Sequence, residues 1–167
     1  MKKTMYIVLL LLIFYATGAA ARVSEPKYRF GVGVILGEPI GFTGKYWLNN
    51  KEAYDLSVSS RFSSYLYLSG AYLYHNYDIF KNQKDPGSAS LYYGGGFRLI
   101  ADSEHHYRKH YEDDTYDSIF GLRGTIGGSY LMPNQPFEIF IELSPVMNIT
   151  PATDLDFSAG IGARFMW

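Results

Sequence analysis

The last thirteen residues of the chain alternate between two kinds of side chain without a break. From Leu155 to Trp167 the odd positions are apolar, and the even positions are polar, glycine or methionine. Neighbouring side chains of a β-strand point to opposite faces, so one face of this segment is apolar along its whole length. A tilted strand needs about 9–11 residues to cross a bilayer. The segment therefore predicts a strand whose apolar face meets lipid.

The other end of the chain predicts export. Lys2 and Lys3 form a basic start, an apolar run follows from about Met5 to Tyr15, and Ala19-Ala20-Ala21 offers a small-residue cleavage site. An uncleaved anchor helix is the alternative, but the apolar run is shorter than the ~20 residues that a spanning helix needs. We expect residues 1–21 to be a cleaved secretory signal peptide and residues 22–167 to form one domain.

Composition excludes several classes of protein. The chain has no cysteine, which excludes disulfides, thiolate metal sites and a lipid-modified N-terminal cysteine. Without Lys2 and Lys3 it keeps 13 basic and 16 acidic residues, and this balance predicts no nucleic-acid partner. No run of 18 apolar residues follows the signal, so no transmembrane helix is expected. The 16 Tyr, 11 Phe and 17 Gly suit a small membrane barrel, with aromatics at interfacial depth and glycines on a crowded inner wall.

Seven further segments alternate in the same way and complete an even set of eight. They predict an all-β fold, an eight-stranded antiparallel up-and-down transmembrane β-barrel. The expected strands are Tyr28–Gly37, Gly41–Leu48, Tyr54–Phe62, Tyr65–Asn76, Leu91–Asp102, Ile119–Met132, Phe137–Thr150 and Leu155–Trp167. Most connections are short. The charged segment Ser103–Asp117 is long, and it falls on the cell-surface side if both termini lie in the periplasm.

Two features of the expected strands concern their contact with the membrane and the hydrogen bonds between neighbouring strands. The apolar faces place Tyr and Trp residues near the periplasmic strand ends and Phe residues near the outer ends, which predicts two aromatic belts. Pro145 falls inside a strand although it cannot donate to a ladder, so a bulge or a local break is expected there.

The second face of the strands collects charged residues of both signs. An unpaired buried charge costs several kcal/mol, so these residues are expected to pair with one another inside the barrel. Eight strands enclose only enough room for side chains, which predicts a charge-plugged interior. The alternative is a narrow, porin-like channel lined by charge. The predicted interior ion network is Arg29, Lys45, Asp55, Arg61, Arg98, Arg123, Glu138, Glu142, Asp156 and Arg164.

A soluble lipocalin-like barrel would also have eight strands and a secretory signal, but its apolar face would point inward around a ligand. Here glycine and arginine gather on the polar face, and bulky residues gather on the apolar face. Small residues fit the concave wall of a narrow barrel and large ones fit its convex exterior. The pattern favours the membrane barrel.

Three stretches carry a family resemblance: Gly31–Pro39, Lys45–Leu48 and Gly160–Arg164. Together with the signal they resemble small bacterial outer-membrane barrels such as the OmpA transmembrane domain and OmpX. The final strand is similar to the C-terminal assembly signal of such proteins, with Gly162, Phe165 and Trp167 at its marked positions, although Gly160 replaces a usual polar residue. The resemblance implies the outer membrane of a Gram-negative-type envelope, contact with outer-membrane lipid, and the barrel-assembly machinery as a partner during biogenesis. It implies no particular chemistry, because fold alone does not choose among adhesins, anchors and lipid-modifying enzymes.

The long charged segment is the candidate surface-binding loop, for an extracellular protein ligand. Its candidate contact residues are His105, His106, Tyr107, Arg108, His110 and Tyr111. Imidazole and carboxylate can ligate zinc or copper, but no fixed ligand motif is present, and we expect a solvated loop without metal.

No catalytic residue and no cofactor is predicted. Ser103, Ser118 and His105 fall near the depth that a lipid A deacylase would use, but the local motif of that family is absent. His75 is expected to be a hydrogen-bonding residue of the interior. We predict a monomeric, non-enzymatic cell-surface protein with a structural or surface-interaction role. A narrow channel or a lipid A-modifying enzyme is the alternative.

Overall fold

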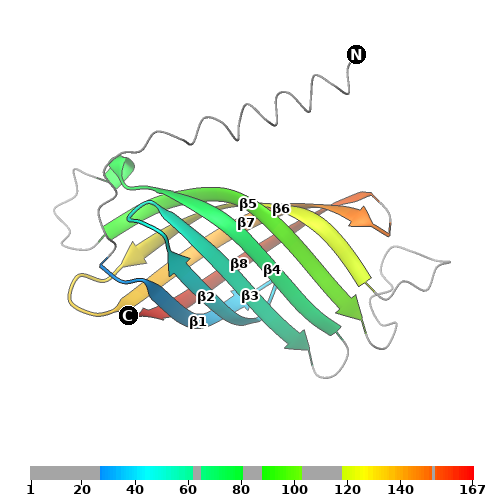
Figure 1. Cartoon of the computed structure of the whole chain (residues 1–167), viewed down its shortest axis with the longest axis horizontal. Helices are drawn as coiled ribbons and strands as arrows, with labels where there is room; N and C mark the ends of the chain where they lie inside the picture. Colours follow the sequence, from blue (N-terminus) through cyan, green and yellow to red (C-terminus); the bar gives the residue numbers. More distant parts are fainter. Residues whose placement is uncertain (1–26, 62–64, 81–87, 103–117, 152) are drawn as a thin grey trace, which may run out of the picture.

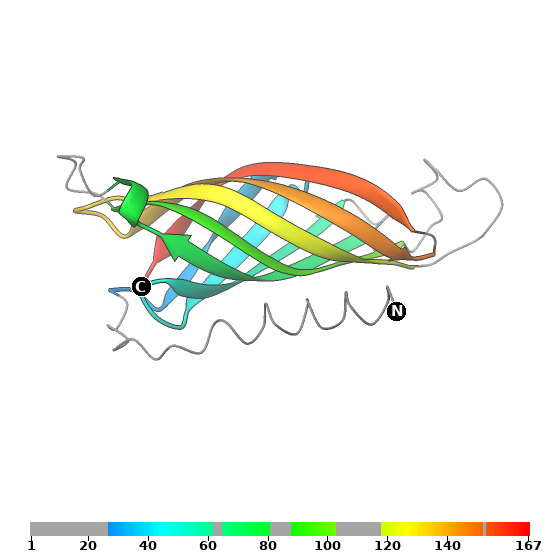
Figure 2. The same ribbon diagram turned by 90° about the horizontal axis from the view of Figure 1, so that it is seen from above.

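Eight antiparallel strands close into one barrel in the computed structural model, and they run obliquely around it (Figures 1 and 2). The structure describes residues 27–61, 65–80, 88–102, 118–151 and 153–167. A short 3-10 helix, η1 (Asp78–Phe80), follows the fourth strand. The all-β class and the eight-stranded antiparallel barrel are thus confirmed. The strands are β1 (Phe30–Gly37), β2 (Gly41–Trp47), β3 (Glu52–Arg61), β4 (Tyr65–Asn76), β5 (Ser88–Asp102), β6 (Ser118–Leu131), β7 (Phe137–Thr150) and β8 (Asp154–Met166).

Each strand pairs with its neighbours in the sequence, and β1 closes the barrel by pairing with β8. The close packing of the inner wall explains some of the glycines. A Cβ added at Gly33 would collide with the carbonyl oxygen of Ala163, and one added at Gly96 would collide with that of Gly70. Side chains at these two positions would push adjacent strands apart, so glycine is required there.

Strand limits differ from the expected ones by a few residues. β1 begins at Phe30, two residues later than expected, and β5 begins at Ser88, three residues earlier. The extension of β5 has a direct cause, because Ser88 pairs with Leu131 and prolongs the ladder with β6. Alternation predicts a strand only where side chains differ in polarity, whereas pairing continues wherever a partner strand is present.

The end of the barrel that holds residues 27–29 and Trp167 is called the terminal end here, and the opposite end is called the loop end. The connections β1–β2, β3–β4, β5–β6 and β7–β8 all lie at the loop end, as the antiparallel order requires. The predicted signal peptide (residues 1–21) and the candidate surface-binding loop (Ser103–Asp117) both lie outside the described residues. Within the described part of the chain, no helix is long and apolar enough to span a membrane.

The two faces of the wall are inverted relative to a soluble barrel. Large apolar side chains are exposed on the outside of every strand, from Phe30 on β1 to Phe165 on β8, and Phe42 is 75% exposed. The inside holds buried lysine, arginine, aspartate and glutamate. This arrangement is opposite to that of a lipocalin-like barrel, in which the polar face meets water.

Aromatic rings on the outer face contact one another around the terminal end. Phe30 lies 5.0 Å from Tyr46 and 6.1 Å from Trp167, measured between ring centroids. Further pairs extend the series across other strands: Tyr54 with Tyr72, Tyr74 with Tyr93, Phe137 with Phe165, and Phe165 with Trp167. These rings form a belt over most of the circumference near one end of the barrel, as the strand alignment predicts.

Pro145 is accommodated by a gap in one ladder. It pairs with Phe157 of β8, but on the β6 side the described pairing stops at Arg123↔Val146 and resumes at Ile126↔Leu143. The register is the same on both sides of the gap, and the shift in this ladder lies instead between Phe120 and Gly121. The proline is therefore tolerated by a local break, without a bulge at its own position.

Candidate functional site: a charge network inside the barrel

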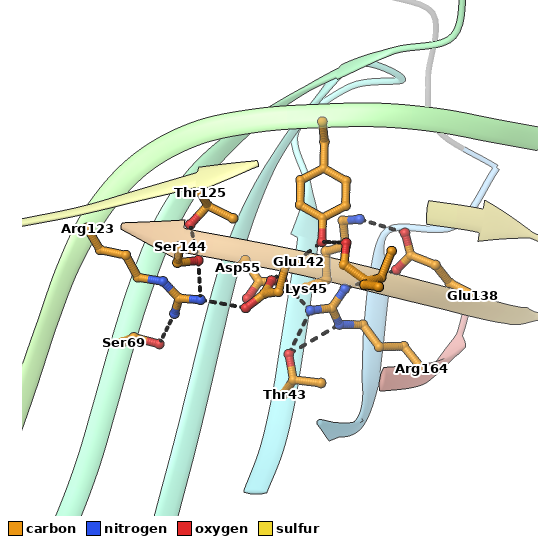
Figure 3. A network of polar contacts seen from close by, with 12 residues as sticks. Thr43, Lys45, Asp55, Ser69, Arg123, Thr125, Glu138, Glu142, Ser144 and Arg164 are labelled. Atoms are coloured by element: carbon orange, nitrogen blue, oxygen red, sulfur yellow. Dashed lines mark hydrogen bonds and ion pairs between the residues drawn. The ribbon is translucent and has the colours of Figure 1, made fainter. Parts of the chain in front are cut away.

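The centre of the interior holds two cations and two carboxylates from four different strands (Figure 3). Lys45 Nζ lies 2.6 Å from Glu138 Oε1, and Arg164 Nη1 lies 3.2 Å from Glu138 Oε2. Arg164 also pairs with Asp55. The Arg164 guanidinium donates to Thr43 Oγ1 from Nε (3.2 Å) and Nη2 (2.8 Å). All five side chains are buried, so the ions depend on one another for solvation.

A second cluster surrounds Arg123, nearer the loop end. Arg123 Nη2 lies 2.5 Å from Glu142 Oε1. The same guanidinium donates to Ser69 Oγ (2.7 Å) and Ser144 Oγ (2.8 Å), as Figure 3 shows. The Tyr92 hydroxyl donates to the second oxygen of Glu142 at 3.4 Å. Neutral hydroxyl groups thus add hydrogen bonds to the ion pair, although the buried Arg123 Nε has no partner among the described residues.

A third cluster lies closest to the loop end and is partly open. Arg98 donates from Nη1 to Asp156 Oδ2 and from Nη2 to Asn148 Oδ1, each at 2.8 Å. The Arg98 side chain is buried, but the Asp156 side chain is 33% exposed. Among the described residues, the interior charges are four cations and four carboxylates, and every one of them belongs to an ion pair.

A histidine cluster lies between the central charges and the terminal end. His75 is fully buried, and its Nδ1 shares a hydrogen bond of 2.9 Å with Ser90 Oγ, which in turn lies 3.0 Å from Ser129 Oγ. The imidazole ring packs 4.5 Å from the Trp47 ring. Lys45 Nζ, which pairs with Glu138, lies 4.4 Å from the centre of that indole. His75 therefore takes the place expected of it, as a hydrogen-bonding residue of the interior.

Apolar clusters flank the charges along the barrel. Tyr67, Ile100 and Ile119 pack together at the loop end, and Ile35, Leu73, Tyr92 and Phe140 pack in the middle. At the terminal end, Trp47, Ala53 and Met166 pack with Tyr28 and Leu131. A hollow of about 210 Å³ opens at this end and reaches Glu138. Tyr77, outside the strands, lines the hollow, and burial raises the pKa of its phenol.

The predicted network residues divide into three groups. Lys45, Asp55, Arg98, Arg123, Glu138, Glu142, Asp156 and Arg164 lie in the interior clusters. Arg29 is exposed just before β1, so it lies outside these buried clusters. Alternation assigns it to the inner face, but at the mouth of a barrel the inner face also meets solvent. The side chain of Arg61 lies outside the described part of the structure.

The other predicted positions are placed as follows. The candidate contact residues His105 to Tyr111 lie outside the described residues. Gly162 faces the interior, where a Cβ would collide with the Phe140 ring, whereas Phe165 and Trp167 are exposed on the outside. Among the described residues, no group of three or more metal-ligating side chains is placed to hold an ion.

Most of the neutral members of the network were missed in the sequence. Thr43, Ser69, Ser90, Ser144 and Asn148 hold the ions or the histidine in place. The signal that could have found them was present, because each occupies the same inner face as the charged residues of its strand. Alternation assigns the serine and threonine residues to that face, but it does not show which residue each of them contacts.

Comparison with known proteins agrees with the architecture. The N-terminal β-barrel domain of Pseudomonas aeruginosa OprF has a similar structure, with a TM-score of 0.53 over 83% of this chain and 96% of that domain. The fold is that of a small OmpA-like barrel. Sequence identity is 13%, so the likeness concerns the fold alone. No protein-family model matches the sequence, and no curated protein matches it.

Proposed function

We infer that this chain is an integral outer-membrane protein with a structural or surface-interaction role and a closed interior. The apolar outer face and the aromatic belt support membrane insertion, because amphipathic rings favour the depth of the lipid headgroups. The likeness to the OprF barrel domain supports the outer membrane as the location. Export by a cleaved signal peptide is part of the proposal.

The observation that carries the closed interior is the pairing of every described interior charge. Opening a pore through the centre would require Lys45, Glu138 and Arg164 to separate. Separating them inside the barrel would leave buried charges without partners, and one uncompensated buried charge costs about 3–5 kcal/mol. The tyrosine and isoleucine cluster at the loop end adds a second constriction.

Surface interaction is assigned to the candidate surface-binding loop, residues 103–117. Loops held on a rigid barrel commonly carry recognition, and this segment is not needed to close the sheet. Its tyrosines, histidines and Arg108 are residue types that suit a protein ligand. Persistence of binding to a confirmed partner after residues 109–114 are deleted would place recognition elsewhere.

Conductance and membrane extraction test the rest of the proposal. The folded protein is expected to fractionate with outer membranes and to change its gel mobility on heating, as closed barrels do. In a planar bilayer it should pass no more current than the bilayer alone. Steady single-channel current from the unmodified chain would refute the closed interior. Lipid A altered only when the chain is expressed would show that it is an enzyme.

A further inference from the structure

The last strand of the barrel, β8, is longer than the strand that closes on it. It pairs with β7 from Asp154 onward. Its pairing with β1 begins only at Gly160, which lies opposite Gly37. Residues 154–158 therefore have a partner strand on one side alone, and β8 runs on past the end of β1 at the loop end (Figures 1 and 2). This stretch, residues 154–158, is called the β8 edge here.

The backbone groups on the open side of the β8 edge belong to Leu155 and Phe157. The Ala159 carbonyl accepts a hydrogen bond of 2.8 Å from the amide of Glu38, the residue that follows β1. Residues two apart in a strand direct their backbone groups to the same side. Leu155 and Phe157 therefore turn their N–H and C=O groups to the side where β1 has ended.

Two aspartates cap the amides on this open side. The Leu155 amide donates to Asp154 Oδ1 at 2.8 Å. The Phe157 amide donates to Asp156 Oδ1, also at 2.8 Å. Among the described residues, neither amide donates to the backbone of another strand on this side. A strand edge with open backbone groups is a template for an added strand, whose carbonyl groups would replace the two carboxylates.

The position of the β8 edge makes it accessible to a partner in water. Open sheet edges do not occur in the hydrocarbon of a bilayer, because lipid cannot satisfy the backbone groups. We therefore expect this edge at the depth of the headgroups or beyond them. Its outward side chains, Leu155 and Phe157, are 69% and 64% exposed, and they offer apolar contact to one face of an added strand.

The charge around the β8 edge is predominantly negative. The Asp154 carboxylate is exposed, and it keeps its charge because an amide is its hydrogen-bond donor. Asp156 is neutralised by Arg98, which lies 2.8 Å from its second oxygen. Segment 103–117, which begins at the same end of the barrel, has five acidic and two basic residues. The other charged residues at the loop-end limits of the strands are two acids and one arginine: Glu38, Asp102 and Arg61.

These charges favour a basic partner over a second copy of this chain. Antiparallel pairing of two β8 edges about their centre would place Asp156 opposite Asp156, and like charges directly opposite one another destabilise a sheet. A basic strand has the opposite effect. When its carbonyl group takes over the Leu155 amide, the Asp154 carboxylate is released and can pair with a lysine or arginine of the added strand.

We propose that the β8 edge binds an extended, basic segment of a partner protein as an additional strand of the sheet. The segment pairs through its backbone with Leu155 and Phe157. Its apolar side chains pack beside theirs on the outer face, and a lysine or arginine pairs with Asp154. This inference deepens the proposed surface-interaction role and rests on it, since the loop end must face the cell exterior to meet such a partner.

A short synthetic peptide in which valine alternates with lysine tests the proposal. The full chain is refolded in a neutral detergent, and binding of the dye-labelled peptide is followed by fluorescence anisotropy. The peptide should bind saturably and should slow the hydrogen exchange of the Leu155 and Phe157 amides. A peptide of the same length in which glutamate replaces lysine should not bind.

Two pairs of variants separate the backbone contribution from the charge. Phe157→Pro removes an amide on the open side and leaves the pairing with β7 intact, so it should abolish binding. Phe157→Val loses the ring but keeps the amide, and it should retain most of the binding. Asp154→Asn should weaken binding by up to about fivefold, the effect of one cross-strand charge pair. Glu52→Gln, which removes a carboxylate at the terminal end, is its matched control and should leave the affinity unchanged.

Equal affinity for the lysine and glutamate peptides would overturn the proposal, and so would equal binding by Phe157→Pro and Phe157→Val. Slow exchange of both amides in the free chain would also overturn it, because the edge would already be covered. Restoration of exchange by deleting residues 109–114 would identify the chain's own segment as the cover, and restoration by dilution would identify a second copy.

Heat-modifiable gel mobility shows whether the barrel is folded in each variant. A folded barrel that binds neither peptide refutes the β8 site alone. A chain that is recovered from cells as a soluble periplasmic protein refutes the proposed function, and the partner proposed for the β8 edge with it.

Discussion

Glu138 is the residue whose loss should most disturb the interior. Its two oxygens receive Lys45 at 2.6 Å and Arg164 at 3.2 Å, and its side chain is 3% exposed. Glu138→Gln keeps the volume and removes the charge. Arg164 retains Asp55 as a partner, but Lys45, which is fully buried, loses the carboxylate that pairs with it. We expect the free energy of unfolding to fall by about 3–5 kcal/mol, the cost of leaving a buried charge uncompensated.

The hollow at the terminal end determines where the destabilisation by Glu138→Gln falls within this range. It reaches Glu138, so water can approach the stranded Lys45 ammonium and lower the cost toward about 3 kcal/mol. The double variant Lys45→Met with Glu138→Gln removes the stranded charge and leaves Arg164 neutralised by Asp55. Replacing both members of a buried pair is often nearly neutral. The double variant should therefore unfold within about 1 kcal/mol of the unmodified barrel.

Urea titration of the refolded barrel in detergent or vesicles measures these values, with tryptophan fluorescence and heat-modifiable mobility as two signals. Glu38→Gln, an exposed acid in the β1–β2 connection, is the control and should stay within about 0.5 kcal/mol of the unmodified chain. The reasoning fails if Glu138→Gln is as mild as Glu38→Gln. It fails equally if the double variant is destabilised by the sum of its two single variants, since independent sites add in that way.

Three further outcomes follow from the geometry. Arg123→Met should lower the free energy of unfolding by about 3–5 kcal/mol, because it leaves the buried Glu142 without its cation. Arg98→Met should lower it by only about 1–3 kcal/mol, because Asp156 reaches solvent. Urea titration compares the two variants, and the reverse order would contradict the burial argument. Gly96→Val should prevent barrel closure, seen as loss of the heat-modifiable band, since its Cβ would strike the backbone of β4. Phe165→Ala should reduce outer-membrane assembly in cells yet leave refolding in detergent intact if the final aromatics act as an assembly signal; equal loss in both settings would indicate a folding defect.

Alternation along each strand was enough to predict the fold and the face of most charged residues, because a period of two follows directly from strand geometry. It could not predict which acid meets which base. Arg164 contacts Thr43 and Asp55, which lie 121 and 109 residues earlier in the chain, and only the closure of β1 on β8 brings them together. Alternation also does not show how far along the barrel axis a residue lies. Arg29 shares the periodicity of the inner face, but it lies beyond the first paired residues of β1, where solvent replaces the interior.

The filled interior also limits where this protein can recognise another molecule. Eight strands enclose a space that side chains alone occupy. Here each described interior ion pairs with an opposite charge, and the three arginines also bond neutral groups, as Arg123 holds Glu142, Ser69 and Ser144. A ligand entering that space would have to replace these hydrogen bonds one by one, at about 1–3 kcal/mol for each group left unpaired. The outer wall imposes no such cost, because its apolar side chains exchange one lipid contact for another. Recognition is therefore expected outside the interior, in the segment 103–117.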